Sequence, residues 1–396
     1  MITEDFSTGK FTEAEKQTLS DFGFLVESSE IERKEMLNFI DALGELSRTF
    51  AAKVAMNLDC NLSCKYCFEG ARKGKYYMTS ETADLFLGFL NNRVASDKEK
   101  VLITFYGGEP LLSLDLIIYM SERIKGLAGS KCFPYEGHII TNGTLLTRKN
   151  AKRLASCGVT GAYVTIDGPR DVHNSYRPFE SGKGSFDIIV KNLKESCDVL
   201  ELQIGGNFTS DNFREFPLLL DYIRANGLPP ERISGVRFEP VTKERADIAP
   251  PEFHGGCGSL NEEWLFNAGL YLREEILKRG YKNYTIVPTA CSLDMKEHFL
   301  VNYDGGIFKC PGLIGREEYK VGHLKTGMKY NRQPQGLDSW KNEECLNCAY
   351  LPLCFGGCRY MKLVRDGNMD GVDCKKPYLD ACLETLVKQD IRYGLV

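Results

Sequence analysis

Several residue types and segments are scarce in this 396-residue chain, and each scarcity excludes a class of protein. No apolar run approaches the roughly 18–20 residues of a membrane-spanning helix, and Met1–Lys10 lacks the apolar core of a signal peptide. The formal net charge of −4 offers no broad cationic surface for phosphate groups. We therefore expect a cytoplasmic protein that has neither a membrane nor a nucleic acid as its partner.

Histidine (five residues) and tryptophan (two) are rare, whereas cysteine occurs fifteen times. Structural disulfides are uncommon in the reducing cytoplasm, and a cysteine content of about 4% is well below that of a disulfide scaffold. Clustered cysteines in such a chain are therefore expected to bind metal. A hydrophobic fraction of 43% and a charged fraction of 26% indicate a globular chain of two or three domains, or one large barrel with an appendage.

The sequence pattern divides the chain into five parts. These are an N-terminal helical module at 1–50, a barrel at 51–242, a linker and bridging helix at 243–289, a cysteine-rich region at 290–376 and a C-terminal helix at 377–396. The N-terminal module is predicted to have helices over Phe11–Ser20 and Ile31–Leu46 around an apolar segment at Gly23–Val26. The linker has the Pro-Pro and Gly-Gly pairs typical of such segments, and Asn261–Arg279 is predicted to be the bridging helix.

Short apolar runs alternate with helical patterns through the second part. The predicted strands are Lys53–Asn57, Val101–Tyr106, His138–Thr141, Ala162–Asp167, Glu201–Asn207 and Val236–Val241, and the predicted helices are Thr79–Asn91, Leu114–Leu127, Thr147–Cys157, Ser185–Glu195 and Phe213–Asn226. The strand runs are rich in β-branched or aromatic residues, which is typical of buried parallel strands. Six such units predict an α/β fold, a partial (β/α)6 TIM-like barrel.

The first group of cysteines, Cys60, Cys64 and Cys67, follows the first predicted strand, where a barrel of this kind carries its catalytic groups. Three thiolates are one short of a closed tetrahedral zinc site, whereas a [4Fe–4S] cube held by three cysteines keeps one iron open to a ligand. A zinc site completed from elsewhere and coincidental core cysteines are the alternatives. No histidine follows Cys67, which excludes attachment of a c-type haem.

Later strand ends carry signals of their own. The second predicted strand ends in the sequence GGEP at 107–110, where two glycines allow a close backbone approach and the glutamate can accept from an ammonium group. The third ends in Thr-Asn at 141–142 and the fourth in Thr-Ile-Asp at 165–167, followed by His173 and Arg177. Each signal alone fits an ordinary turn, but on successive strands they predict one site. For His173 we expect a structural hydrogen-bonding role.

The CxxxCxxC spacing, with an aromatic residue before its last cysteine, together with GGEP after the next strand, resembles the radical S-adenosylmethionine (SAM) superfamily. The resemblance implies that Cys60, Cys64 and Cys67 are the catalytic cysteines and hold a [4Fe–4S] cluster whose open iron binds SAM. It also implies reductive cleavage of SAM to a 5′-deoxyadenosyl radical, with a flavodoxin- or ferredoxin-type reductant as partner. The residues implied around SAM are Tyr66, Gly107, Gly108, Glu109, Pro110, Thr141, Asn142, Thr165, Asp167 and Arg177.

The cysteine spacing between 291 and 374 resembles the SPASM extension, which is appended to radical SAM enzymes that modify peptides and proteins and carries auxiliary [4Fe–4S] clusters. The resemblance implies three clusters in all, with Cys345, Cys348, Cys354 and Cys374 on one auxiliary cluster and Cys291, Cys310 and Cys358 on the other. The fourth site of the latter would be open to a substrate thiolate, or filled by Cys257 or Cys382. The alternative is a zinc-ribbon appendage. Cys132, Cys157 and Cys197 are expected to be core residues.

Two reaction classes of this family compete as predictions. Sulfatase maturases have an aspartate as base directly after the cysteine at position 310, where this chain has Pro311. That departure favours the other class, which matures ribosomally made precursor peptides, and the chain looks most like the geopeptide-type group. A Cys thioether crosslink is the leading product, with a C–C or C–O crosslink and epimerisation as alternatives. A multi-cluster electron carrier is the non-enzymatic alternative, but it has no need of GGEP.

Leader recognition is a separate question. Many peptide maturases carry a leader-binding domain of roughly 80–90 residues ahead of the barrel, and residues 1–50 are too few for a complete one. We expect this module to be either a reduced leader-binding domain or a cap on the barrel.

Overall fold

The computed structural model describes residues 11–21, 28–45, 49–67, 69–94, 100–242, 256–288, 291–329 and 338–395. The chain forms two compact units, Met1–Ser47 and Arg48–Val396. In the first unit, helices α2 (Glu13–Asp21) and α3 (Ser29–Glu45) confirm the two predicted helices, and the predicted apolar segment at 23–26 lies outside the described residues. Helix α2 buries none of its side chains.

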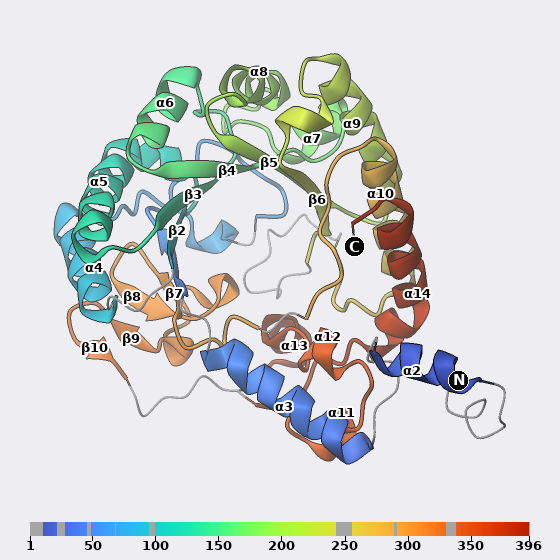
Figure 1. Ribbon diagram of the computed structural model, residues 1–396. Helices are drawn as coiled ribbons and strands as arrows, with labels where there is room; N and C mark the ends of the chain where they lie inside the picture. The colour runs from blue at the N-terminus through green and yellow to red at the C-terminus, as the bar shows by residue number, and fades with distance from the viewer. Residues whose placement is uncertain are drawn as a thin grey trace. The chain divides into compact units, whose positions relative to one another are not determined.

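Six parallel strands form the centre of the second unit. They are β1 (Thr49–Ala55), β2 (Lys100–Tyr106), β3 (Tyr135–Thr141), β4 (Val159–Thr165), β5 (Glu201–Phe208) and β6 (Gly235–Pro240), and each is hydrogen-bonded to the next. Figure 1 shows the sheet curving, with helices along its outer side. These helices are α4 (Ser80–Arg93), α5 (Leu114–Lys131), α6 (Arg148–Ser156), α8 (Phe186–Ser196) and α9 (Phe216–Ala225). The predicted partial (β/α)6 barrel is confirmed.

The alternation of side chains along each strand determines which side of the sheet holds the hydrophobic core. On β2, Val101, Ile103 and Phe105 are fully buried on the side of the helices, while the residues between them face the barrel interior. Phe86 and Leu90 of α4 are fully buried in the same hydrophobic core. Burial of a side chain of this size stabilises the fold by roughly 1.5–3 kcal/mol. The outer layer of the barrel is therefore the main core, and the interior is left to polar side chains.

Short strands in the cysteine-rich region extend the barrel sheet. β7 (His298–Val301) pairs in parallel with β1, and β8 (Gly306–Phe308), β9 (Gly322–His323) and β10 (Gly327–Met328) continue it antiparallel. These strands have two to four residues, too few for a sequence pattern, and the sequence predicted only loops here. The strand pairing anchors the segment before Cys310 to the edge of the barrel.

Helices α10 (Glu263–Lys278) and α14 (Lys376–Arg392) lie side by side (Figure 1), and both were predicted. Arg273 joins them through an ion pair with Asp390 and a hydrogen bond of 2.9 Å from its guanidinium to Gln389 Oε1. The predicted boundaries at 242, 289 and 376 stay predictions. No helix within the described ranges is long and apolar enough to cross a bilayer.

Two local differences from the sequence prediction matter for the site. β1 ends at Ala55, not Asn57, so that 56–59 belong to the loop that leads into the cysteines. The remaining helices around the site, α7 (Arg170–Tyr176) and the 3-10 turn η2 (Pro110–Ser113), are too short to show a hydrophobic period, and neither was predicted.

Candidate functional site

A cavity of about 400 Å³ lies at the carboxyl ends of the barrel strands, and Cys60, Cys64 and Cys67 are on its wall. The cysteine loop is fixed by its own hydrogen bonds, because the backbone N–H of Cys60 donates to Asp59 Oδ1 at 2.9 Å. Two N–H groups point at the sulfur of Cys60, from Leu62 N at 3.4 Å and Asn142 Nδ2 at 3.8 Å. Such bonds favour the thiolate form that an iron–sulfur cluster needs.

The pair Gly107-Gly108 is required by the chain itself. A Cβ on Gly107, whose φ is +148°, would lie 2.4 Å from the carbonyl oxygen of Asn57, and one on Gly108 would lie 2.2 Å from that of Asp59. The N–H of Gly108 donates to Asn57 O at 3.1 Å. The close backbone approach that the sequence predicted is thus already made, by the loop that carries the cysteines.

Glu109 is fully buried, and its carboxylate binds the neighbouring strand end. It accepts hydrogen bonds from Thr141 Oγ1 at 2.7 Å, Asn142 N at 2.8 Å and Leu111 N at 3.0 Å. Burial raises the pKa of Glu109, and these hydrogen bonds oppose the rise. The residues of this strand end that line the cavity are Tyr106, Gly107 and Gly108, so Glu109 and Pro110 lie behind the wall. Contact of Glu109 with the SAM ammonium stays a prediction.

Tyr66, Asp167 and Arg177 form a buried network on the other side of the cavity. Arg177 donates to the Tyr66 hydroxyl at 2.8 Å and lies 3.9 Å from the Asp167 carboxylate, to which the Tyr66 hydroxyl also donates. Burial raises the pKa of Asp167, while the charge of Arg177 opposes that rise. The Nε of Arg177 is buried without a partner in the described part of the chain. Thr165 is on the same wall.

His173 supports this network from outside the cavity. Its Nδ1 accepts from the backbone N–H of Asp167 at 3.1 Å, and its Nε2 is 3.0 Å from Ser185 Oγ. Burial lowers the pKa of His173 to about 3, so the ring is neutral. These contacts are structural, as the sequence predicted for this residue.

Five residues that the sequence reasoning missed also line the cavity: Glu69, Lys73, Tyr163, Asn207 and Glu239. Lys73 donates to the carbonyl oxygen of Leu62 at 2.9 Å, inside the cysteine loop. Burial raises the pKa of Cys60 to about 11 and of Cys67 to about 12, and the charge of Lys73 lowers both. The sequence signal that could have indicated Lys73 is a basic residue six positions after Cys67. Where that side chain points, however, depends on how the loop folds.

Cys291, Cys310 and Cys358 come together in the second unit. Burial raises the pKa of Cys310 to about 12, and the thiolates of Cys358 and Cys291 add to the effect. The charges that act on Cys257 come from Glu262 and Glu239 instead, and on Cys382 only burial acts. Among the described residues, the cysteines whose charges act on Cys310 are thus Cys358 and Cys291, and neither reserve cysteine is one of them. The ligands of this auxiliary cluster stay a prediction.

Arg359 links the segments that carry these cysteines. Its guanidinium is fully buried and donates at 2.8 Å to the carbonyl oxygens of Phe355 and Gly357, and at 3.2 Å to the Asp294 carboxylate. Phe355, Gly356 and Gly357 have φ values of 42°, 73° and 73°, so the chain between Cys354 and Cys358 is a left-handed turn. A Cβ on Gly357 would lie 1.8 Å from Asp373 O, which makes glycine necessary there.

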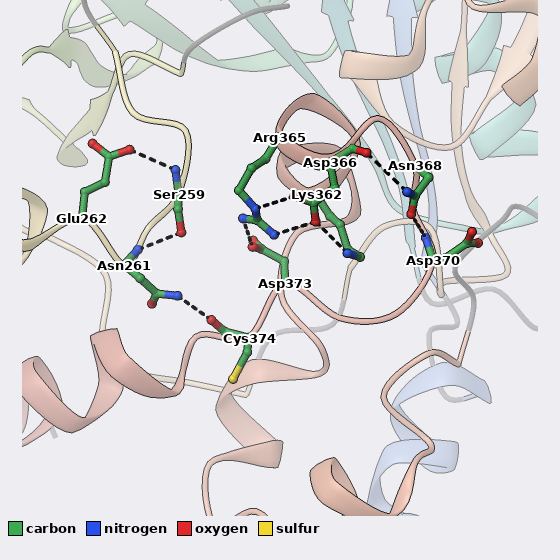
Figure 2. Close-up of polar contacts among 10 residues, drawn as sticks. All are labelled: Ser259, Asn261, Glu262, Lys362, Arg365, Asp366, Asn368, Asp370, Asp373 and Cys374. Atoms are coloured by element: carbon green, nitrogen blue, oxygen red, sulfur yellow. Dashed lines mark hydrogen bonds and ion pairs between the residues drawn. The ribbon is translucent and has the colours of Figure 1, made fainter.

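Burial raises the pKa of Cys345, and the charges of Cys354 and Cys374 add to this rise. Cys345 and Cys354 lie on α11 (Glu343–Leu346) and α12 (Leu351–Cys354), helices of four residues each, and Cys348 lies between them. Cys374 is exposed, and Figure 2 shows its carbonyl oxygen accepting from Asn261 Nδ2 at 2.8 Å. Figure 2 also shows Arg365 paired with Asp373, at 2.7 Å.

The donor set fits iron–sulfur clusters in both regions, since it consists of thiols that are not paired in disulfides. Within the described ranges, no three His, Cys, Asp or Glu side chains converge on one point as the ligands of a single ion would. In a cube, each thiolate binds a different iron, so convergence on one point is not required.

The model of the radical SAM superfamily matches residues 56–217, the region that holds the first cysteine loop. The chain is 23% identical to the cysteine-type anaerobic sulfatase-maturating enzyme of Clostridium novyi, over 80% of this chain and 90% of that protein. It is 29% identical to the Fe-coproporphyrin III synthase of Methanosarcina barkeri over 177 residues, only 44% of this chain and 41% of that protein.

Solved structures share the fold. Native anSMEcpe with bound AdoMet and Cp18Cys peptide has a TM-score of 0.66 at 18% identity, with 87% of this chain and 99% of that chain covered. SuiB of Streptococcus suis bound to the precursor peptide SuiA has a TM-score of 0.59 at 15% identity, with 83% and 75% covered.

The match identifies residues 56–217 as a radical SAM domain, and proteins of this superfamily bind SAM and a [4Fe–4S] cluster. Along most of its length the chain is similar in sequence to a sulfatase-maturating enzyme, and it shares its fold with anSMEcpe and SuiB.

Proposed function

We propose that this enzyme matures a ribosomally made precursor peptide by a net oxidation that forms a Cys thioether crosslink. Cys60, Cys64 and Cys67 would hold the SAM-binding cluster, and two auxiliary clusters would lie in the C-terminal region. When reduced, the first cluster with its bound SAM supplies a 5′-deoxyadenosyl radical that abstracts a hydrogen atom from the peptide.

The chain's own residues would bind and orient these groups. Asn142 and the N–H of Leu62 point at the Cys60 sulfur, and Lys73 adds a positive charge beside the cysteine loop. Arg177 is held against Tyr66 and Asp167, and its buried Nε has no hydrogen-bond partner among the described residues. We assign Arg177 to the SAM carboxylate or ribose. The tyrosines at 66, 106 and 163 wall the cavity and would exclude water.

The observation that carries the choice of reaction is the residue after Cys310. Pro311 begins the 3-10 turn Pro311–Leu313 and has no proton-accepting side chain, where the sulfatase maturases have their aspartate. If Cys291, Cys310 and Cys358 are its only ligands from this chain, an auxiliary cube would keep one iron for a substrate thiolate. That iron could also take the second electron of the oxidation.

Formylglycine formation is the second candidate, and the likeness to a sulfatase-maturating enzyme over 80% of this chain favours it. The two reactions differ in mass. A thioether crosslink removes two hydrogens from the peptide and leaves its sulfur, whereas conversion of cysteine to formylglycine removes the sulfur. Reconstituted enzyme should be incubated anaerobically with SAM, dithionite and the small peptides encoded beside its gene. Loss of sulfur from the product would overturn the proposal in favour of the second candidate.

Leader binding by residues 1–48 is tested separately, by deleting them and measuring the affinity for the same peptide. We expect weaker binding, and unchanged affinity would exclude a leader-binding role for this segment. Three clusters predict about twelve irons per chain, which an iron assay on the reconstituted protein measures.

A further inference from the structure

A second cavity, of about 390 Å³, lies in the barrel interior next to the cluster site. Its wall consists largely of the inward-facing residues of the six parallel strands, among them Lys53 on β1, Thr104 on β2, Gln203 on β5 and Arg237 on β6. Ile140, Tyr163 and Glu239 line both cavities. A substrate bound at the cluster site can therefore extend into the interior without leaving the barrel.

Four charged side chains line the interior cavity, and two of them pair with each other. The four are Lys53, Glu201, Arg237 and Glu239. Arg237 forms an ion pair with Glu239, and its guanidinium lies 4.9 Å from the centre of the Tyr284 ring. Glu201 is the first residue of β5. It lies at the same level of the sheet as His138 of β3, because both residues pair with Gly161 of β4. Lys53 has no ion pair or hydrogen bond to any described residue's side chain, although it faces this cavity.

The surroundings of Lys53 suit an anion. Burial lowers the pKa of Lys53, the charge of Cys310 opposes this, and the like charge of Arg237 lowers the pKa further. Thr104 and Gln203 line the same space and can donate hydrogen bonds to an oxygen. Two glutamates on the wall balance its two cations and oppose a polyanion such as a phosphate ester. Because Glu239 is paired with Arg237, Lys53 is the wall cation without an ion pair among the described residues, and a single carboxylate is the charge that it can neutralise.

Lys53 also borders the auxiliary region. It lines a smaller cavity of about 170 Å³ together with Ser292 and Pro311, and the charge of Cys310 acts on it. An anionic group on Lys53 would therefore lie between the SAM site and the segment of Cys291 and Cys310.

We propose that Lys53, with Thr104 and Gln203, forms a subsite inside the barrel that binds a carboxylate of the peptide substrate, next to the residue that is modified. This subsite rests on the proposed function, and it names a substrate class: peptides with an acidic group beside the reacting residue. The group is either an Asp or Glu side chain or the C-terminal carboxylate.

The test uses three probe peptides and the reconstituted enzyme with SAM. The first is acetyl-Gly-Cys-Gly-Asp-Gly-amide, the second has Asn in place of Asp, and the third has Asn and a free C-terminal carboxylate. Equilibrium dialysis measures their binding. We expect the aspartate peptide or the free-carboxylate peptide to bind about tenfold more tightly than the neutral one, since charge-assisted hydrogen bonds are worth roughly 1.5–3 kcal/mol. Which of the two gains affinity distinguishes the two sources of the carboxylate.

Variants of Lys53 assign the preference to this residue. Lys53→Met should bind all three peptides equally, and Lys53→Arg, which keeps the charge, should retain the preference. Lys53→Glu should favour a probe with Lys in place of Asp. The matched control is Lys100→Met, because Lys100 is on the neighbouring strand but is paired with Glu136 and does not line the cavity. It should bind as the wild type does.

Equal binding of the three peptides by the wild type, including no binding of any, overturns the subsite. A preference that survives in Lys53→Met overturns it as well. Failure of the proposed function would be recognised by a different result. A wild type that forms no 5′-deoxyadenosine from SAM and dithionite would not be a radical SAM enzyme, whatever peptides it binds.

Discussion

The two cysteine regions of this enzyme are held in different ways. The loop of Cys60 is fixed by the residues that follow β2 and β3. Asn57 in this loop donates to Glu109 O, the glycines at 107–108 lie against its backbone, and Asn142 points at the Cys60 sulfur. The second region has helices of four residues, α11 and α12, with an exposed Cys374 near them. The difference indicates that the barrel positions its cluster, whereas a bound cluster would position much of the second region.

The charges around the two regions differ too. Lys73 and Arg177 act on the first group of thiols from a cavity wall that is open to a ligand. In the second region, the fully buried Arg359 donates hydrogen bonds to two carbonyl oxygens and the Asp294 carboxylate. The charges around the first group therefore face a cavity that can take a ligand, whereas the buried charge of Arg359 in the second region joins segments of the chain.

The largest expected effect comes from Cys64→Ala. We expect 5′-deoxyadenosine formation to fall below detection, because the cube loses one of its three ligands, while the thermal unfolding temperature changes little. Product analysis by chromatography and a thermal scan measure the two quantities. Cys132→Ser is the control, since Cys132 is exposed at the C-terminal end of α5. The prediction that Cys132 is a core residue is wrong, because this cysteine caps the helix at the surface. Full activity of Cys64→Ala would show that the barrel cysteines do not hold the catalytic cluster.

Arg359→Met should affect stability more than any single barrel substitution of a cavity-lining residue. Asp294 would lose its buried partner and two carbonyl oxygens would lose their donors, a cost of roughly 3–5 kcal/mol. Urea unfolding followed by tryptophan fluorescence measures it, because Trp340 packs on Phe355 in this turn. A loss below about 1 kcal/mol would contradict the idea that Arg359 joins the cysteine segments.

A third prediction concerns pH and the barrel site. The pKa of His173 is lowered to about 3 in the folded protein, against an ordinary value of 6.5. The folded state therefore binds fewer protons, and this contribution to stability is complete above pH 6.5 and is lost as the pH falls toward 3. Between pH 7 and pH 5 the loss is about 2 kcal/mol. In His173→Gln this part of the pH dependence should vanish, whereas an unchanged pH profile would show that His173 is already charged.

The smallest expected effect is on the potential of the first cluster. Lys73→Met removes a positive charge that acts on Cys60 and Cys67, so the cluster should be harder to reduce. A redox titration followed by electron paramagnetic resonance measures the midpoint potential, and Lys73→Arg should restore it. An unchanged potential in Lys73→Met would mean that the lysine only ties the loop through Leu62.

The sequence predicted the barrel and its cysteines because both leave local patterns. Buried parallel strands are continuous apolar runs, and cluster ligands recur at short spacings. Lys73, Asn207 and Glu239 leave no such pattern, because only the folding of distant loops and strands brings them to the cavity. The strands β7 and β8 were missed for a different reason. They are short. β7 forms by pairing with strand β1, about 250 residues earlier in the chain, and β8 by pairing with β7.

Glu109 shows the limit of a motif. The GGEP sequence located the cavity, but it could not reveal that the carboxylate is bound by Thr141 and Asn142. Pro311 shows the opposite case, since our choice between the two reaction classes rests on this single residue after Cys310, which the sequence alone shows.

The central claim is that the barrel cluster alone cleaves SAM and that the second region serves the peptide. The most direct measurement compares 5′-deoxyadenosine formation in the wild type and in a variant with alanine at 345, 348, 354 and 374, both reconstituted and reduced with dithionite. We predict that both form 5′-deoxyadenosine and that only the wild type modifies its peptide. A wild type that binds iron but forms no 5′-deoxyadenosine would contradict the account.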